Sequence, residues 1–83
     1  MQDLRILVVD DDPWIVRTVT RVLAGPGYRI ESSSDGQDAF AKACAAPCDL
    51  LITALRLPKM DGVMLVRALR ARPGDEVAAP TLN

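Results

Sequence analysis

The chain has 83 residues, a length that fits one domain with a modest core. Ten basic and eleven acidic residues give a formal net charge of -1 without a basic run, which argues against binding to nucleic acid or to an anionic membrane surface. No apolar run approaches the ~20 residues of a membrane-spanning helix, and the acidic N-terminus does not match a secretory signal. We therefore expect a cytoplasmic protein.

The first predicted unit is a strand followed by a helix. Residues 5–10, RILVVD, form a short continuous apolar run, which is typical of a parallel strand buried on both faces. Asp12 and Pro13 are typical of an N-cap and a first helical position, and GPG at 25–27 ends the helix after Ala24. The apolar residues Ile15, Val19, Val22 and Leu23 recur at helical spacing up to Ala24. Trp14 is expected to be a partly buried packing residue.

Two further strand and helix units follow. Residues 28–32 predict a second strand, and Asp35 caps a helix over residues 36–45. Residues 50–53 predict a third strand, and Asp61 caps a third helix. The residues expected to face inward from these two helices are Ala39, Phe40, Ala43, Cys44, Leu65, Val66 and Leu69. This alternation of strands and helices predicts right-handed crossovers and a parallel α/β sheet with helices on both faces.

Cys44 and Cys48 are the only cysteines, and the chain has no histidine. A tetrahedral zinc site therefore cannot be assembled from this chain alone. We expect both thiols to be reduced and to act as small apolar residues; a redox pair is the alternative.

Ligand sites in such sheets lie beyond the carboxyl ends of the strands. Three segments are placed there, at residues 10–12, 32–35 and 54–61. The clustered carboxylates of Asp10 and Asp11 suit Mg²⁺, which prefers hard oxygen ligands. The alternative is an acidic loop that only complements the dipole of the following helix.

The motifs ILVVDDDP, YRIESSSDGQDA and DLLITALRLPKMDG appear in order along nearly the whole chain, which resembles the receiver domain of two-component response regulators. The resemblance implies a flavodoxin-like, three-layer parallel sheet with strand order 2-1-3-4. It also implies that Asp10, Asp11 and the backbone carbonyl of Arg56 are the Mg²⁺ ligands. The residues that it implies for shaping the adjoining loop are Pro58, Met60, Asp61 and Gly62.

The chain departs from this family at Ala54, where the family carries the aspartate that accepts a phosphoryl group from a kinase histidine. Alanine has no nucleophilic atom and no metal-binding oxygen, so we expect no phosphotransfer, no enzymatic activity and at most a weak, vestigial Mg²⁺ site. Asp49 cannot replace the missing carboxylate because it lies about 16 Å away at ~3.3 Å per residue. Thr53 should point to the other face, because side chains alternate along a strand.

A second departure concerns the C-terminal part of the family's fold, which carries a hydroxyl residue and a lysine that bind the phosphoryl group. We expect residues 1–83 to be a receiver-like domain truncated at its C-terminus, in which residues 79–83 at most begin a fourth strand. We hypothesise that Arg56 or Lys59 partly replaces the missing lysine beside Asp10 and Asp11. The alternative is that both bases are solvated loop charges.

Three functions remain open. The first is a phosphorylation-independent interaction module of two-component signalling, whose partner is a sensor kinase, a downstream signalling protein, or a second copy bound through the exposed sheet edge. The second is an inactivated or truncated fragment of an ordinary phospho-accepting response regulator. The third is a nucleotide-binding domain, which is weakened because Gly25 and Gly27 follow the first helix and do not open it.

Overall fold

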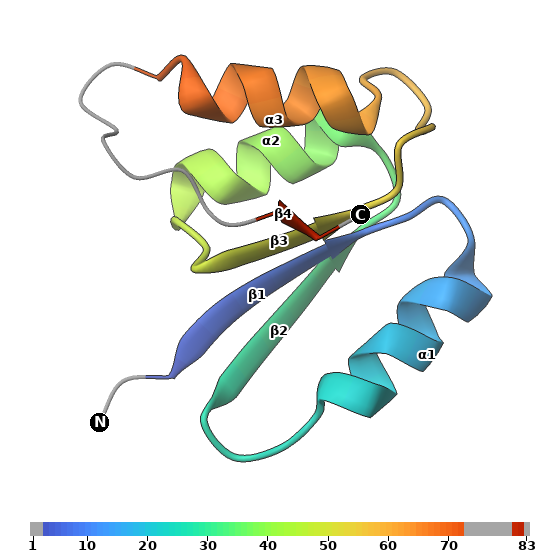
Figure 1. The fold of residues 1–83 in the computed structure, drawn as a ribbon, viewed down its shortest axis with the longest axis vertical. Coiled ribbons are helices and arrows are strands. Elements are labelled where there is room, and N and C mark those ends of the chain that lie inside the picture. The colour runs from blue at the N-terminus through green and yellow to red at the C-terminus, as the bar shows by residue number, and fades with distance from the viewer. Residues whose placement is uncertain (1–2, 73–80, 83) are drawn as a thin grey trace.

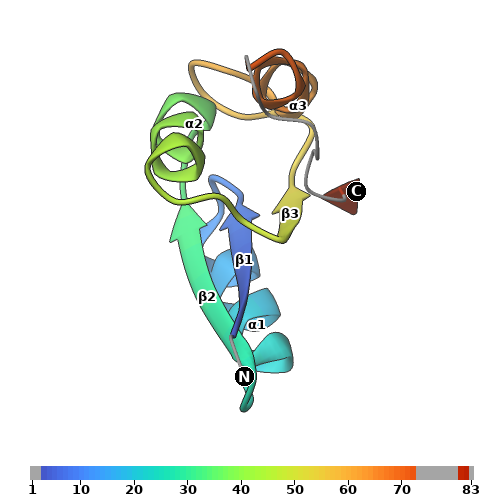
Figure 2. The ribbon, with the colours of Figure 1, turned by 90° about the vertical axis from the view of Figure 1, so that its left-hand side faces the viewer.

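The computed structural model describes residues 3–72 and 81–82, which form a parallel sheet of four strands and three helices. The strands are β1 (Leu4–Val9), β2 (Tyr28–Ser33), β3 (Leu50–Thr53) and β4 (Thr81–Leu82). The helices are α1 (Pro13–Leu23), α2 (Gly36–Ala45) and α3 (Gly62–Arg70). The strand order is β2-β1-β3-β4, and α1 covers one face of the sheet while α2 and α3 cover the other (Figures 1 and 2). This arrangement confirms the predicted three-layer α/β fold.

The element bounds agree with the predicted ones to within a residue at most ends. β1 ends one residue before Asp10, β2 extends to Ser33, and α1 ends one residue before Ala24. The predicted start of a fourth strand is confirmed at residues 81–82, which pair with Leu51 and Ile52. The remainder of that prediction, residues 79–80 and 83, lies outside the described residues, as do residues 73–76.

The main core lies between the sheet and the layer formed by α2 and α3. β1 is buried at all four positions from Ile6 to Val9, which explains why its apolar run is continuous and does not alternate. The members of the core cluster are Leu7, Val9, Ala39, Ala43, Leu51 and Leu65. Phe40, Val66 and Leu69 pack against this cluster, as the sequence predicts.

α1 packs less completely than α2 and α3. It contacts β1 and β2, yet none of its residues is fully buried. Ile15 is 41% exposed and Val22 is 76% exposed, so these two members of the apolar periodicity do not face the sheet. The half-buried residues of the helix are Val16, Val19, Thr20 and Leu23. Trp14, expected to be partly buried, is 71% exposed. No described element covers the flank that carries Ile15 and Val22, so these side chains remain in water.

Within the described residues, no helix is long and apolar enough to cross a membrane.

Candidate functional site

The tip of β3 lies beside the end of β1. The backbone N–H of Ala54 donates to the carbonyl oxygen of Val9 at 2.9 Å, which continues the β1–β3 ladder by one residue. Thr53 is 3% exposed, and its hydroxyl donates to the Ala54 carbonyl oxygen at 2.9 Å. The threonine hydroxyl is therefore buried and already bonded, and the side chain at the tip itself is a methyl group.

The acidic segment after β1 makes several local hydrogen bonds. The Asp10 N–H donates to the Ser33 carbonyl oxygen at 3.1 Å, and Asp10 Oδ1 accepts from the Asp12 N–H at 3.0 Å. Asp12 Oδ1 accepts from the Trp14 N–H at 3.0 Å, which makes Asp12 the N-cap of α1, as predicted. Asp11 is exposed, and within residues 3–72 and 81–82 its carboxylate has no hydrogen-bond partner.

The loop after β3 is held against the starts of two helices. A Cβ atom on Gly36 would lie 1.8 Å from the Met60 carbonyl oxygen, so only glycine lets the loop approach α2 this closely. The Met60 N–H donates to the Pro58 carbonyl oxygen at 2.7 Å, and Lys59 between them has φ 70°. Asp61 Oδ1 accepts from the Met64 N–H at 2.8 Å and caps α3. Arg56 is an exposed residue of this loop.

Lys59 does not neutralise the acidic pair. Its Nζ lies 3.8 Å from Asp35 Oδ2, at the N-cap of α2, because the loop folds over the start of that helix. Among the described residues, no ion pair joins Asp10 or Asp11 to a lysine or an arginine. The hypothesis was that Lys59 or Arg56 partly replaces the missing lysine beside Asp10 and Asp11. Neither base forms an ion pair with these two carboxylates in the described residues, so the hypothesis is wrong in this structure.

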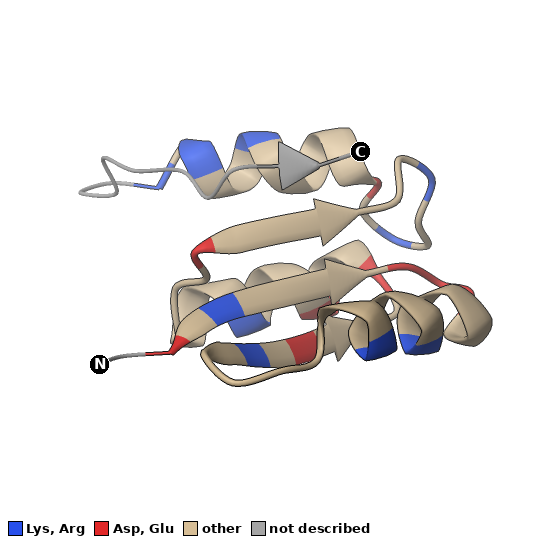
Figure 3. Cartoon of the chain, turned by 60° about the horizontal axis from the view of Figure 1, so that its bottom comes forward, with Lys and Arg blue, Asp and Glu red and all other residues tan. Residues whose placement is uncertain are grey.

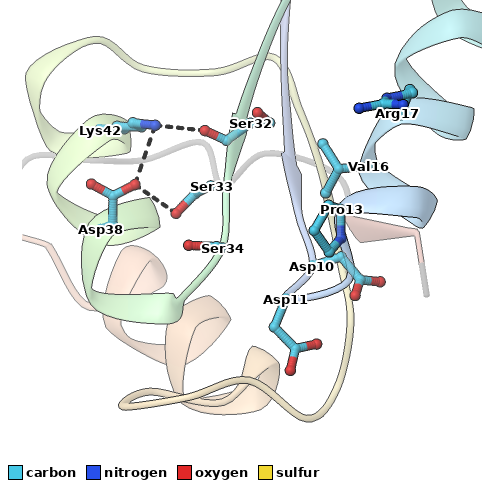
Figure 4. A pocket seen from close by; sticks show the side chains of 10 residues that line it. All are labelled: Asp10, Asp11, Pro13, Val16, Arg17, Ser32, Ser33, Ser34, Asp38 and Lys42. Carbon is cyan, nitrogen blue, oxygen red and sulfur yellow. Dashed lines mark hydrogen bonds and ion pairs between the residues drawn. The ribbon is translucent and has the colours of Figure 1, made fainter.

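A pocket of about 430 Å³ joins the tips of β1 and β2 (Figure 4). Its lining residues are Asp10, Asp11, Pro13, Val16, Arg17, Ser32, Ser33, Ser34, Asp38 and Lys42. Two of the three predicted tips meet in this pocket, since both the acidic segment and the serines after β2 line it. The third tip, with Ala54 and Arg56, is not part of its lining.

A hydrogen-bonded network within the pocket was missed by sequence reasoning. The Ser33 hydroxyl lies 2.8 Å from Asp38 Oδ2 and 2.9 Å from the Asp35 carbonyl oxygen, and Lys42 Nζ lies 3.2 Å from Asp38 Oδ2. Lys42 also donates to the Ser32 carbonyl oxygen. The hydrogen bond from Ser33, followed by that from Lys42, lowers the pKa of Asp38. The i,i+4 spacing of Asp38 and Lys42 was a usable signal for the ion pair.

The residues at the opposite end of the sheet take no part in the site. The Arg5 N–H donates to Asp49 Oδ2 at 2.8 Å, which confirms that Asp49 lies at the start of β3, far from Ala54. Gly27, with φ 93°, accepts a hydrogen bond from the Leu4 N–H at 2.8 Å and so lies at the start of β1. The glycines at 25 and 27 are therefore at the wrong end of the sheet to hold a phosphate at the strand tips.

The donors near the β3 tip make a poor magnesium site. Asp10 and Asp11 supply two carboxylates, but Ala54 contributes no oxygen from its side chain. No group of three or more acidic, cysteine or histidine side chains in the described part of the chain is placed to share a metal ion. Mg²⁺ demands near-ideal octahedral coordination by oxygen, so the donor set does not fit a tight site.

Comparison with known proteins assigns the family. Residues 6–81 match the response regulator receiver domain. The DNA-binding response regulator MtrA of Mycolicibacterium smegmatis is 41% identical over 70 residues, which cover 84% of this chain and 31% of that protein. The gliding motility regulatory protein of Myxococcus xanthus is 36% identical over 70 residues, which cover 84% of this chain and 9% of that protein.

Solved structures give the same assignment. A chemotaxis response regulator of Vibrio cholerae aligns with a TM-score of 0.80 and 35% identity over 86% of this chain and 59% of its own. A response regulator of Chloroflexus aurantiacus, described as putative, aligns with a TM-score of 0.82 and 30% identity over 89% of this chain and 61% of its own. The chain thus spans less than a third of these two curated relatives and about three fifths of these solved chains.

The chain belongs to the response regulator receiver domain family of two-component systems. Members of this family are signalling modules that interact with kinases and other proteins and commonly bind Mg²⁺ at the phosphorylation site.

Proposed function

We propose that this receiver domain signals through protein contacts that do not depend on phosphorylation. The observation that carries the proposal is Ala54, which stands at the tip of β3 where the family's phosphoacceptor aspartate is expected. Formation of an acyl phosphate requires a carboxylate oxygen that attacks phosphorus and then carries the phosphoryl group. A methyl group supplies no such atom.

The side chains around Ala54 support the same conclusion. The Thr53 hydroxyl is buried and bonded to a carbonyl oxygen, so it is not free to attack an incoming phosphoryl group. Asp61 accepts a hydrogen bond from the backbone of α3, and Asp49 is bonded to Arg5 at the other end of the sheet. None of these groups is placed to take over the role of acceptor.

Magnesium binding is expected to be weak. Asp10, Asp11 and the carbonyl oxygen of Arg56 are the ligands that this site would offer, and no third carboxylate completes the coordination. Trp14, the only tryptophan, follows the acidic segment directly and reports on its surroundings. We expect little change in Trp14 fluorescence at millimolar Mg²⁺; saturable quenching in that range would contradict a weak site.

The experiment that tests the proposed function is treatment of the chain with a small-molecule phosphoryl donor and Mg²⁺, followed by intact mass measurement. A receiver domain with its aspartate present serves as the control for the reagent. We expect no added phosphoryl group on this chain. A hydroxylamine-labile phosphoryl adduct at any carboxylate would overturn the proposal.

The partner in this proposal is a sensor kinase, a downstream signalling protein or a second copy. The sheet offers one route, because strands with unpaired backbone groups at a sheet edge can add a strand from another chain. The activities named for the longer relatives, such as DNA binding by MtrA, would require regions beyond the aligned part of those proteins.

The second candidate is that these residues are an inactivated or truncated fragment of an ordinary phospho-accepting response regulator, whose parent undergoes Mg²⁺-dependent aspartyl phosphorylation. The short share of each curated relative that this chain covers favours it as an alternative. An Ala54→Asp variant tests this second candidate. If it accepts a phosphoryl group from the same donor, the remaining residues of the site still support phosphorylation, which favours the second candidate.

A further inference from the structure

β2 is an edge strand whose backbone is open on one side. Its neighbour in the described sheet is β1, and β4 lies at the opposite edge. The chain of the longer relatives continues from the β4 side, and the strand order 2-1-3-4 of the family also leaves β2 at the edge. The open side of β2 is therefore a property of the fold that does not depend on the length of this sequence.

Every second residue of β2 directs its backbone groups to the open side. The Leu4 N–H donates to the Gly27 carbonyl oxygen at 2.8 Å, and the Asp10 N–H donates to the Ser33 carbonyl oxygen at 3.1 Å. The odd-numbered residues thus bond to β1, because residues of a strand bond alternately to its two sides. The residues whose backbone groups face outward are Tyr28, Ile30 and Ser32. Lys42 donates to the Ser32 carbonyl oxygen, which keeps a second lone pair.

Two exposed arginines of α1 border this edge. Arg17 and Arg21 lie one turn apart, and the basic positions of α1 are on the side of the helix toward β2 (Figure 3). Arg17 also lines the pocket with the serines at the end of β2 (Figure 4). Neither guanidinium group forms an ion pair with another residue of the described chain, so both are available to a partner's carboxylates.

The spacing of these arginines matches that of alternate residues in a strand. α1 runs in the opposite direction to β2 (Figure 1), and the four residues from Arg17 to Arg21 rise about 6 Å along the helix. Two residues of an extended strand span about 6.6 Å. An extended segment beside β2 with carboxylates at positions i and i+2 would therefore place one carboxylate near each arginine.

We propose that β2 binds an extended acidic segment of a partner protein, which joins the sheet as an antiparallel strand. Ser33 bonds to Asp38 of α2, so Ile30 and Ser32 direct their side chains to the opposite, α1 face. The two acidic residues of the segment lie opposite Ser32 and Ile30 on this face, below the α1 arginines. Antiparallel pairing is slightly more stable per residue than parallel pairing.

The next alternate position of the segment lies opposite Tyr28 and is expected to be apolar. Tyr28 is 47% exposed, and its register partner Leu4 is 50% exposed. An apolar side chain there would cover part of both. In strand addition the main-chain hydrogen bonds supply the affinity, and the side chains on alternate positions select the segment.

The acidic residues of the chain do not oppose this contact. Glu31 points to the α2 face because side chains alternate along β2, and it is paired with Arg5. Asp38 is paired with Lys42 on α2. The acidic segment at residues 10–11 follows β1, which β2 separates from the added strand.

Charge disfavours a second copy of this chain as the occupant. Antiparallel pairing of two β2 edges about a two-fold axis would place both α1 helices on the same face of the joined sheet. Arg17 and Arg21 of one copy would then face the same two residues of the other across the junction. Juxtaposed like charges are costly at an interface, whereas an acidic segment neutralises them.

This inference deepens the proposed function by giving the chemistry of the partner segment, and it rests on that proposal for its role in signalling. The binding itself does not involve Ala54. The two can therefore fail separately: loss of this inference would leave the mass measurement on the phosphoryl donor reaction unaffected.

The test is calorimetric titration of the 83-residue chain with the acetylated and amidated peptide Thr-Thr-Glu-Thr-Glu-Thr-Leu-Thr. We expect saturable binding of one peptide per chain. Replacing both glutamates of the peptide by glutamine should weaken binding several-fold. The double variant Arg17→Glu, Arg21→Glu should weaken binding of the glutamate peptide about tenfold, because it removes two attractions and adds two repulsions.

The matched control is the double variant Arg67→Glu, Arg70→Glu. Both arginines are exposed on α3, away from β2, and the change in net charge is the same. This variant should bind the glutamate peptide as the wild type does. A peptide with lysine in place of both glutamates should in turn bind the Arg17→Glu, Arg21→Glu variant better than it binds the wild type.

Methylation of the peptide's backbone nitrogens separates strand addition from plain charge attraction. In the antiparallel arrangement the N–H groups of the two glutamates and the leucine face β2, whereas those of the intervening threonines face solvent. N-methyl groups on the first set should abolish binding. N-methyl groups on the threonines should leave most of it.

Three results would overturn the proposal: no saturable binding of the glutamate peptide, equal binding of the glutamine peptide, or equal loss with the two N-methylated peptides. Thermal unfolding shows that each variant is folded. Sedimentation equilibrium of the chain alone tests the other occupant. A dimer that the peptide dissociates would mean that a second copy occupies the β2 edge, which also overturns the proposal.

Discussion

Gly62 and Ala54 are in contact through their backbones: a Cβ atom built on Gly62 would lie 2.2 Å from the Ala54 carbonyl oxygen. The Gly62 N–H also donates to the Leu55 carbonyl oxygen at 2.8 Å. The start of α3 is thus fixed against the tip of β3 at a distance that only glycine permits. The position of the residue at the phosphoacceptor site depends on this contact.

Gly62→Ala should therefore destabilise the fold. The added methyl group meets backbone atoms, which cannot move aside as a flexible side chain can, so we expect a loss of about 1–3 kcal/mol. Denaturant unfolding measures this loss. Gly25→Ala is the control, since a Cβ there meets nothing within 4 Å. Equal stability of the two variants would contradict the close contact at Gly62.

Leu65 and Met64 are neighbours on α3 with opposite environments. Leu65 is 0% exposed in the core, whereas Met64 is 54% exposed. Leu65→Ala should cost about 2–5 kcal/mol, because it removes buried apolar surface and leaves a cavity. Met64→Ala should cost well under half of that. Chemical denaturation of both variants checks the prediction, and similar losses would mean that α3 does not pack as described.

Asp38 should make the stability of the domain dependent on pH in the acid range. Hydrogen bonds from Ser33 and Lys42 lower its pKa from the ordinary value of 3.8. A carboxyl group with a lowered pKa stabilises the fold above that ordinary value, and the contribution disappears as the pH falls through the folded-state pKa. Asp38→Asn should therefore be less stable than wild type at neutral pH and equal to it in strong acid.

The control for this experiment is Asp11→Asn, because Asp11 has no hydrogen-bond partner within the described residues. The free energy of unfolding of Asp11→Asn should differ little from that of the wild type across the same pH series. A constant stability difference for Asp38→Asn at all pH values would show that the network does not act through the charge of Asp38.

Cys48 should react slowly with thiol reagents. Burial raises the pKa of its thiol from 9.0, and the nearby Asp49 acts in the same direction. The thiolate is the reactive form, so little of it exists at neutral pH. The folded state binds the Cys48 thiol proton more tightly than the unfolded state does. The free energy of unfolding should therefore fall as the pH rises above 9.0. Alkylation of the native chain with mass detection checks the rate; reaction as fast as in denaturant would contradict the burial.

Much of the fold was predictable from local patterns. The continuous apolar run of β1 indicated burial on both faces, and Asp12, Asp35 and Asp61 marked three helix starts that the structure confirms. These signals are local, since a cap or a buried strand depends on residues a few positions apart. The family also followed from the order of three motifs.

The sequence alone was less informative about which charges meet. It left open whether Arg56 or Lys59 neutralises the acidic pair or whether both are solvated, whereas the loop folds over Gly36 and brings Lys59 to Asp35. It did not join Ser33 to Asp38, because that contact depends on how α2 lies against the end of β2. Contacts between side chains of different elements depend on packing angles, which no short pattern encodes.

By itself, the sequence determined the α/β layering, the strand order expected for the family and the absence of a nucleophile at Ala54, because these follow from periodicity, motif order and the chemistry of one side chain. Only the tertiary structure decided that Ile15 and Val22 remain in water. Both belong to the apolar periodicity of α1, but periodicity does not distinguish a flank that meets the sheet from one beside it, since burial requires a neighbouring element to cover the side chain.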